Sequence, residues 1–108
     1  MADGRVFVRN ALWFRDDGGA EKYRAYANAA APSVSELGAR MHAGYRPDLA
    51  LIGDWKPDLL FFMDWPSLEA FQRLPSHPEY QKIAPMREEA LERSLLIRCR
   101  AASLEELQ

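Results

Sequence analysis

The pattern of apolar and polar residues predicts a strand near the middle of this chain. The segment 59–65 reads Leu-Leu-Phe-Phe-Met-Asp-Trp, and its first five residues are all apolar. A strand with one face in water alternates apolar and polar side chains, which this segment does not do. We therefore predict a strand that is buried on both faces. Pro66 should end it, and Ser67 is predicted to cap a helix that begins at Leu68.

A strand and a helix are predicted at the start of the chain. Residues 5–15 carry apolar side chains at both alternating positions, which predicts a first strand. A helix is expected over 20–37; Pro32 should kink or restart it, and Gly38 should end it. The apolar stripe of this helix falls at helical spacing and consists of Tyr23, Ala27, Ala30, Val34 and Leu37.

A weaker second strand is expected over 39–52, where Pro47 indicates an edge strand or a bulge. A loop over 53–58 should join it to the strand at 59–65 as an antiparallel hairpin. The elements predicted after that strand are a helix over 68–74, a helical piece that starts near Pro78 and bends at Pro85, a strand over 95–99, and a polar tail over 102–108.

The predicted order is strand, helix, strand, strand, helix, strand. This is the ferredoxin-like βαββαβ order, an α+β fold with both helices on one face of a four-stranded antiparallel sheet. The strands over 5–15, 59–65 and 95–99 nevertheless carry apolar side chains on both faces. A second copy of the chain is the simplest cover for the other face, so we expect a homodimer with the two sheets face to face. The alternative is a monomer with a large exposed apolar face, which is rare.

The composition is that of one globular domain over residues 1–108. The chain is 48% hydrophobic and 28% charged, and its formal net charge is -2. This charge balance, with no basic stripe, argues against binding to nucleic acid or to an anionic membrane. We expect neither a signal peptide nor a membrane span. Cys99 is the only cysteine, so no internal disulfide is expected and the cytoplasm is the expected location.

Short motifs follow one another in a recognisable order along residues 6–99. They are Tyr23-x-x-Tyr26, Gly38-Ala39-Arg40, Gly53-Asp54-Trp55, Trp65-Pro66-Ser67, His77-Pro78-Glu79-Tyr80 and Arg87. In this order the chain resembles the domain-of-unknown-function family 1330, one of the dimeric α/β-barrel proteins. The resemblance implies the ferredoxin-like fold and a dimer, but no established activity. Related barrel families include cofactor-free monooxygenases, isomerases, decarboxylases and haem-binding enzymes, an analogy at the level of the fold alone.

The chain departs from the family pattern at three positions. Ala39 stands where the family commonly has glycine, Leu59 where it often has a basic residue, and His77 where it has serine. These positions fall near the ends of strands, where such barrels keep their cleft. The departures therefore argue against carrying over any shared chemistry.

Two histidines are candidates for acid–base chemistry. His42 lies in the second strand and His77 in a break between helices, and imidazole titrates near neutral pH. Each also fits a simpler role, as a surface residue or a helix cap. Two histidines 35 positions apart give no metal-ligand spacing, so we expect no metal site.

A second candidate group consists of Tyr80 and Arg87, which share one helix face at spacing i, i+7. Together they could orient a carboxylate or an enolate, with Arg87 supplying a planar fork of donors. The alternative is a tyrosine in the core and an arginine paired with Glu88 or Glu89.

Aromatic side chains are candidates for the wall of a small-molecule site. Trp13, Trp55, Trp65 and Phe61 could form a pocket for a flat substrate, joined by Tyr26. Aromatic residues on a sheet are more often core residues. No nucleotide-binding, phosphate-binding or nucleophile-elbow motif is present, so we expect no cofactor.

Two functional hypotheses follow from these residues. The first is a cofactor-independent enzyme of oxygenase or isomerase type that acts on an aromatic or enolisable metabolite. It would use a cleft between sheet and helices. The second is a non-catalytic domain that binds a metabolite in the same cleft.

Overall fold

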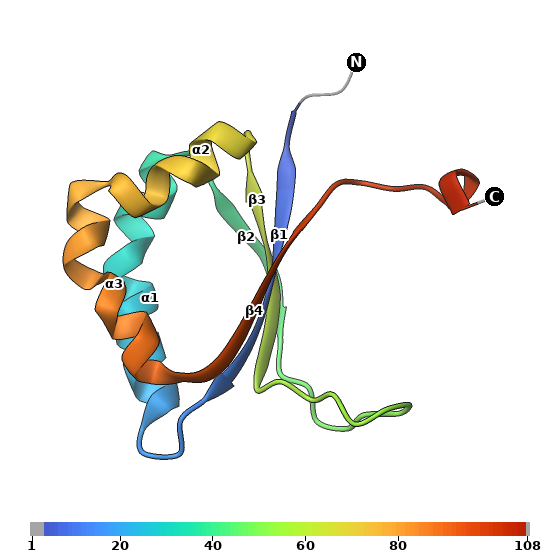
Figure 1. Cartoon of the computed structure of the whole chain (residues 1–108), viewed down its shortest axis with the longest axis horizontal. Coiled ribbons are helices and arrows are strands. Elements are labelled where there is room, and N and C mark those ends of the chain that lie inside the picture. Colours follow the sequence, from blue (N-terminus) through green and yellow to red (C-terminus); the bar gives the residue numbers. More distant parts are fainter. Residues whose placement is uncertain (1–3, 108) are drawn as a thin grey trace.

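The strands of the computed structural model, which describes residues 4–107, form one four-stranded sheet (Figure 1). Its order is β2-β3-β1-β4, and each neighbouring pair is antiparallel. The strands are β1 Val6–Phe14, β2 Arg40–Tyr45, β3 Leu59–Trp65 and β4 Leu91–Cys99. The predicted α+β, ferredoxin-like fold is confirmed.

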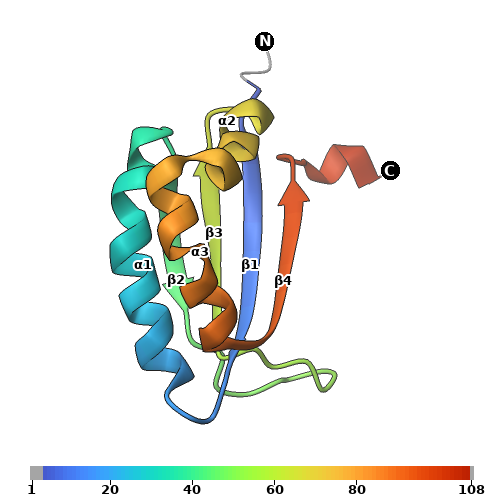
Figure 2. The same ribbon diagram turned by 60° about the vertical axis from the view of Figure 1, so that its left-hand side comes forward.

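The helices cover one face of this sheet. They are α1 Gly19–Glu36, α2 Leu68–Arg73 and α3 Pro78–Ala90, with short 3-10 turns η1 Leu74–Ser76 and η2 Leu104–Leu107. Figure 2 shows α1 and α3 side by side in front of the strands, with α2 near one end of the sheet. No helix within residues 4–107 is long and apolar enough to cross a membrane.

Two strand boundaries and the course of one helix differ from the predicted ones. Strand β2 ends at Tyr45 instead of 52, because Pro47 cannot donate a ladder hydrogen bond and the chain leaves the sheet before it. Strand β4 begins at Leu91 instead of 95. The start of β4 carries the polar residues Glu92 and Arg93, so the apolar pattern does not predict a strand there, although Arg93 pairs with Trp13 of β1. Helix α1 runs through Pro32 without a restart.

Local sequence explains where two helices end and begin. Gly38 has φ +86°, a left-handed conformation that favours glycine, and its N–H donates to the carbonyl of Ser35 at 2.9 Å. The N–H of Ala39 donates to the carbonyl of Val34 at 3.2 Å, which completes a Schellman end for α1. At the start of α2, Ser67 Oγ accepts a hydrogen bond from the N–H of Ala70 at 3.0 Å. Both predicted boundaries are confirmed.

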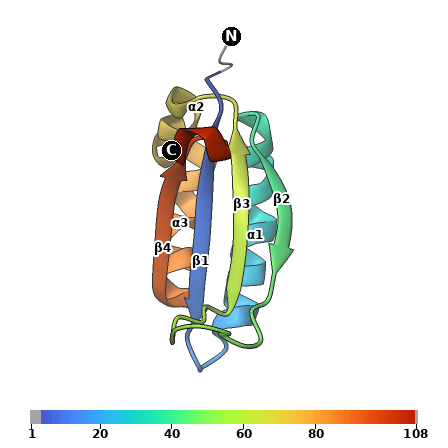
Figure 3. The same cartoon turned by 90° about the vertical axis from the view of Figure 1, so that its right-hand side faces the viewer.

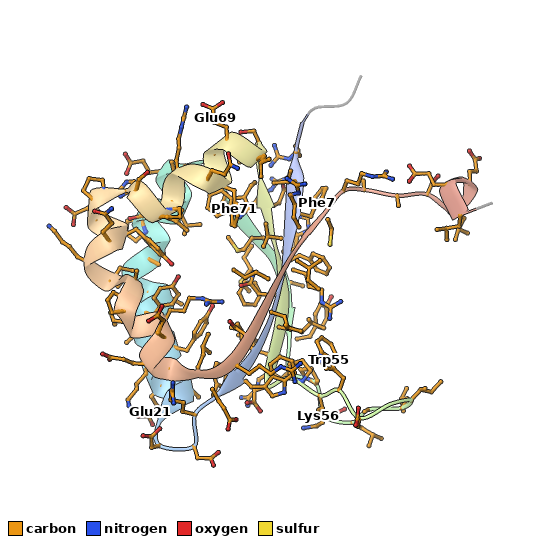
Figure 4. The ribbon with its side chains drawn as sticks, viewed as in Figure 1. Phe7, Glu21, Trp55, Lys56, Glu69 and Phe71 are labelled. Atoms are coloured by element: carbon orange, nitrogen blue, oxygen red, sulfur yellow. The ribbon has the colours of Figure 1, made fainter. Side chains whose placement is uncertain are left out.

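Alternate side chains of each strand point to opposite faces of the sheet. On the side that we call the helix face, Leu12 and Phe61 join Tyr23 and Tyr26 of α1 in the main core. The opposite side, which we call the outer face, carries Phe7, Arg9, Trp13, Leu60, Phe62, Asp64 and Ile97. Figure 4 shows Phe71 of α2 between that helix and the sheet, and Phe7 on the outer side of the sheet.

Candidate functional site

A cavity of about 730 Å³ lies between the helix face of the sheet and the helices α1 and α3. This volume is within the usual range for small-molecule sites. Most of its lining is apolar and includes Val8, Val34, Phe61, Met63, Trp65 and Phe71. The apolar lining follows from the parity of the strands, because the side chains of β1 and β3 that face the helices are nearly all hydrophobic.

The polar groups of this cavity come mainly from three elements. The hydroxyl oxygens of Tyr26 on α1 and Tyr80 on α3 are 2.6 Å apart and share a hydrogen bond. Arg87, two turns after Tyr80 on α3, has a buried Nη2 atom with no hydrogen-bond partner within residues 4–107. Asn10 of β1 is buried and donates from Nδ2 to the carbonyl of Val8 at 3.4 Å. The cavity thus combines apolar walls with a small number of polar groups.

Two phenols of this cavity, those of Tyr23 and Tyr26, have raised pKa values. Burial raises the pKa of Tyr23 to about 12, against a smaller opposing effect of the Arg87 charge. Burial also raises the pKa of Tyr26 well above its ordinary value, and the hydrogen bond with Tyr80 raises it further. The positive charge of Arg87, which lines the same cavity, acts in the opposite direction on the pKa of both tyrosines. At neutral pH both Tyr23 and Tyr26 are therefore hydrogen-bond donors.

The structure brings together five of the residues that the sequence suggested for a site. All five line the cavity, and they are Tyr26, Phe61, Trp65, Tyr80 and Arg87. The alternative in which Arg87 pairs with Glu88 or Glu89 is wrong, because no such ion pair forms in the described part of the chain and both glutamates are exposed.

The prediction that Trp13 and Trp55 share one pocket with Phe61 and Trp65 is wrong. Trp13 follows Leu12 in β1 and so points to the outer face, where its ring lies edge to face with Trp55 at 5.5 Å between centroids. The guanidinium group of Arg9 lies over the Trp55 ring at 4.6 Å, and that of Arg93 lies over the Trp13 ring at 4.5 Å. These tryptophans belong to the surface opposite the cavity, as Figure 4 shows for Trp55.

Neither histidine lines the cavity, contrary to the expectation that one would serve as its acid or base. His42 lies on the outer face, where Nε2 is 3.2 Å from Asp64 Oδ2 and its ring meets Phe7 edge to face. His77 precedes α3, and its Nε2 is 2.9 Å from Oε2 of Glu36 at the end of α1. Both imidazoles therefore contact carboxylates outside the cavity.

The sequence reasoning missed Asn10 and the surroundings of Asp64. Asn10 was not among the predicted site residues. The sequence feature that could have identified Asn10 is its position in the strand. Asn10, Val8 and Leu12 occupy every second position, so their side chains share the face that packs against the helices. Asp64 lies in the predicted strand over 59–65 and was not a predicted site residue either, although a buried acid requires cationic partners.

Asp64 is the centre of a charged cluster on the outer face. Its side chain is only 4% exposed, and Oδ1 accepts from Arg5 Nε at 2.8 Å. Oδ2 lies 3.4 Å from Arg40 Nε and 3.2 Å from His42 Nε2. Burial alone would raise the pKa of Asp64, but the hydrogen bonds from Arg5, His42 and Arg40 outweigh it and hold that pKa below its usual 3.8. Among residues 4–107, no group of three or more His, Cys, Asp and Glu side chains could hold a metal ion.

The lowered pKa of Asp64 predicts a loss of stability in acid. A carboxylate with a lowered folded-state pKa stabilises the fold above its unfolded pKa and stops doing so as the pH falls through the folded value. We expect Asp64→Asn to be less stable than the natural chain at neutral pH. The difference should shrink as the pH drops below about 4, the ordinary pKa of an aspartate.

Urea denaturation at several pH values between neutral and about 3 measures this effect. Asp16→Asn is the matched control, because Asp16 is an exposed aspartate of the turn between β1 and α1. Parallel stability curves for Asp64→Asn and the natural chain over the whole range would contradict the assignment.

The chain is similar to known proteins in both sequence and structure. The family described as Domain of unknown function (DUF1330) matches residues 17–98. A crystal structure of a protein of unknown function from Rhodopseudomonas palustris is 29% identical, covers 94% of this chain and 85% of its own, and has a TM-score of 0.86. No curated protein matches the chain.

Two more distant solved structures share the fold. A dimeric ferredoxin-like protein of unknown function from a Jannaschia species is 13% identical, covers 91% of this chain and 100% of its own, and has a TM-score of 0.69. A dimeric protein of unknown function with a ferredoxin-like fold from Bacteroides fragilis is also 13% identical, with coverages of 91% and 97% and a TM-score of 0.60.

Proposed function

Because this chain belongs to the family Domain of unknown function (DUF1330), whose activity is open, we propose from its own geometry that it is a homodimer that binds a small molecule in the cavity. The observation that carries this proposal is the 730 Å³ space between sheet and helices, with its apolar walls. Small-molecule sites usually combine such walls with a few convergent polar groups. Tyr26, Tyr80 and Arg87 supply those groups here.

The outer face supports the homodimer. Phe62 and Ile97 of the sheet and Trp55 of the loop before β3 are 37%, 43% and 38% exposed on this side, and such clusters of exposed large apolar side chains are unusual. Figures 1 and 3 show two segments, 46–58 and 100–107, that leave the sheet on this side. These two arms carry four leucine or isoleucine side chains that are at least 77% exposed, namely Leu51, Ile52, Leu104 and Leu107. A second copy docked on the outer face would lie between these two segments and cover their exposed apolar side chains.

A second candidate function is catalysis without a cofactor, of oxygenase or isomerase type, on an aromatic or enolisable metabolite. The observation in its favour is that Arg87 and the Tyr26–Tyr80 pair line the same cavity, because such donors can stabilise an enolate. The position of His42 and His77 outside the cavity argues against it, since neither reaches a bound molecule as a general base. We therefore rank binding above catalysis.

The proposal includes no cofactor and places the protein in the cytoplasm. The sequence carries no nucleotide-binding or phosphate-binding motif. The lone cysteine, Cys99, suits a reducing compartment, where disulfides are rare.

Titration with a panel of small phenols, quinones and keto acids tests the proposal. We expect at least one member to bind saturably, as followed by tryptophan fluorescence because Trp65 lines the cavity. Recovery of the ligand unchanged, with and without oxygen, would indicate binding, and a product detected by mass spectrometry would indicate an enzyme.

A matched pair of variants locates the binding. Ala27 is exposed but lines the cavity from α1, so Ala27→Phe should narrow the space and weaken binding at least about tenfold. Ala25→Phe adds the same side chain at an exposed position of α1 outside the lining and should leave binding unchanged. Equal binding by both variants, or no saturable binding at all, would refute the proposed function.

A further inference from the structure

Arg87 presents an unsatisfied cationic donor to the cavity. Its Nη2 atom is buried without a hydrogen-bond partner within the described residues, and Arg87 makes no ion pair there. A buried donor that lacks a partner is costly, and a buried charge more so. An arginine guanidinium is always protonated and presents a planar fork that matches the two oxygens of a carboxylate. The group that would satisfy Arg87 is therefore an anionic acceptor with two oxygens.

The tyrosine pair adds a second donor of the same kind. Between Tyr26 and Tyr80 one hydroxyl donates to the other at 2.6 Å, so one O–H remains for another acceptor. Neither hydroxyl makes another side-chain or backbone hydrogen bond in the described structure. Because burial raises the pKa of Tyr26, its hydroxyl keeps its proton at neutral pH. The remaining O–H and Arg87 both lack an acceptor.

The charge of the lining favours an anion as well. The whole chain has a net charge of -2, yet the ionic residues that line the cavity are four arginines and one glutamate. Of these arginines, Arg40 is already engaged by Asp64, whereas Arg24 and Arg46 are exposed. The glutamate is Glu21 in the first turn of α1, which Figure 4 places at the end of the helix near the turn from β1. The ionic lining therefore has an excess of positive charge, which favours anionic ligands.

We propose that the ligand of this cavity is a carboxylic acid with an apolar body, whose carboxylate is held by Arg87 and by the free hydroxyl of the Tyr26–Tyr80 pair. This inference rests on the proposed function, because it names the class of molecule that the same cavity binds. The carboxylate satisfies the two donors that the protein leaves without acceptors. The apolar body lies against Phe61, Met63 and Trp65.

Isothermal titration calorimetry of the full chain near neutral pH, with three compounds, tests the inference. Cinnamate and cinnamamide have the same flat apolar body and differ in charge, and octanoate is an aliphatic acid. We expect cinnamate to bind at least about tenfold more tightly than cinnamamide, as expected for a charge-assisted hydrogen bond. Tight binding of octanoate would also support a carboxylate site, and its affinity relative to cinnamate tells whether the body is aliphatic or aromatic. This comparison needs no variant.

A variant assigns the preference to Arg87. Arg87→Met keeps an unbranched apolar side chain and should abolish the preference for cinnamate, while cinnamamide should bind within about twofold of its original affinity. Retained cinnamamide binding also shows that the variant is folded. Arg73→Gln on α2, an exposed arginine outside the lining, is the control for the loss of one charge and should retain the preference.

The outcomes separate this inference from the proposed function. If cinnamamide binds as tightly as cinnamate, or if Arg87→Met keeps the preference, the carboxylate site is wrong and the small-molecule cavity stands. If none of the three compounds binds while a neutral phenol or quinone does, the inference is again wrong. Binding of cinnamate that Ala27→Phe does not weaken would contradict both.

Discussion

Phe62→Lys is expected to convert the proposed dimer into monomers at micromolar concentration. Phe62 lies on the outer face of β3, and its backbone pairs with Arg9 of β1 near the middle of the sheet. In a face-to-face dimer, a lysine at this position would lose its water without gaining a partner, because the neighbouring residue is already cationic. A buried unpaired charge costs roughly 3–5 kcal/mol, so the dissociation constant should rise at least about a hundredfold.

Sedimentation velocity over a dilution series measures this change. Gln72→Lys is the control, because Gln72 is exposed on α2 and adds the same charge away from the outer face. A natural chain that sediments as a monomer at micromolar concentration would refute the dimer. A Phe62→Lys protein that stays dimeric would show that the subunits meet on another surface.

The second large effect is expected at Leu12. Its side chain is fully buried in the core between β1, α1 and α3, together with Tyr23, Phe61 and Ala90. Leu12→Ala removes apolar contacts and leaves a cavity, so we expect the free energy of unfolding to fall by about 2–5 kcal/mol. Leu104→Ala makes the same chemical change at a side chain that is 82% exposed. It should change stability by less than about 0.5 kcal/mol.

Urea denaturation of both leucine variants, at one fixed protein concentration, provides the measurement. The concentration must be fixed because dimer formation adds to apparent stability by mass action. A loss below about 1 kcal/mol for Leu12→Ala would show that the neighbouring side chains close the space that the leucine leaves.

The sequence was sufficient for the fold because its strongest signals are local. The run from Leu59 to Trp65 gave both ends of β3, and Gly38 gave the end of α1. The same run did not tell which parity faces the helices, since both faces of β3 are apolar. Which side chains of β3 face the helices depends on the side of the sheet on which α1 and α3 pack, and the sequence of one strand does not contain this information. Trp13 and His42 were misplaced relative to the cavity for this reason.

The site residues could be grouped from the sequence only where they lie on the same helix or strand. Tyr80 and Arg87 share a face of α3, and their spacing alone placed them together. The partner of Tyr80 is Tyr26, which is 54 residues away along the chain, and nothing in the sequence joins the two hydroxyls. Asn10 reaches the cavity through the register of the sheet, which pairs it with Phe61 and Leu96.

The central position of β1 has a consequence for how the chain folds during synthesis. The backbone of Phe7 in β1 pairs with Cys99 in β4, so one side of the first strand stays open until nearly the whole chain has left the ribosome. Contacts this distant in sequence slow folding, and unpaired strand edges promote aggregation meanwhile. Translation that stops before Leu91 would leave β1 as an open edge. We expect such fragments to depend on chaperones or to be degraded.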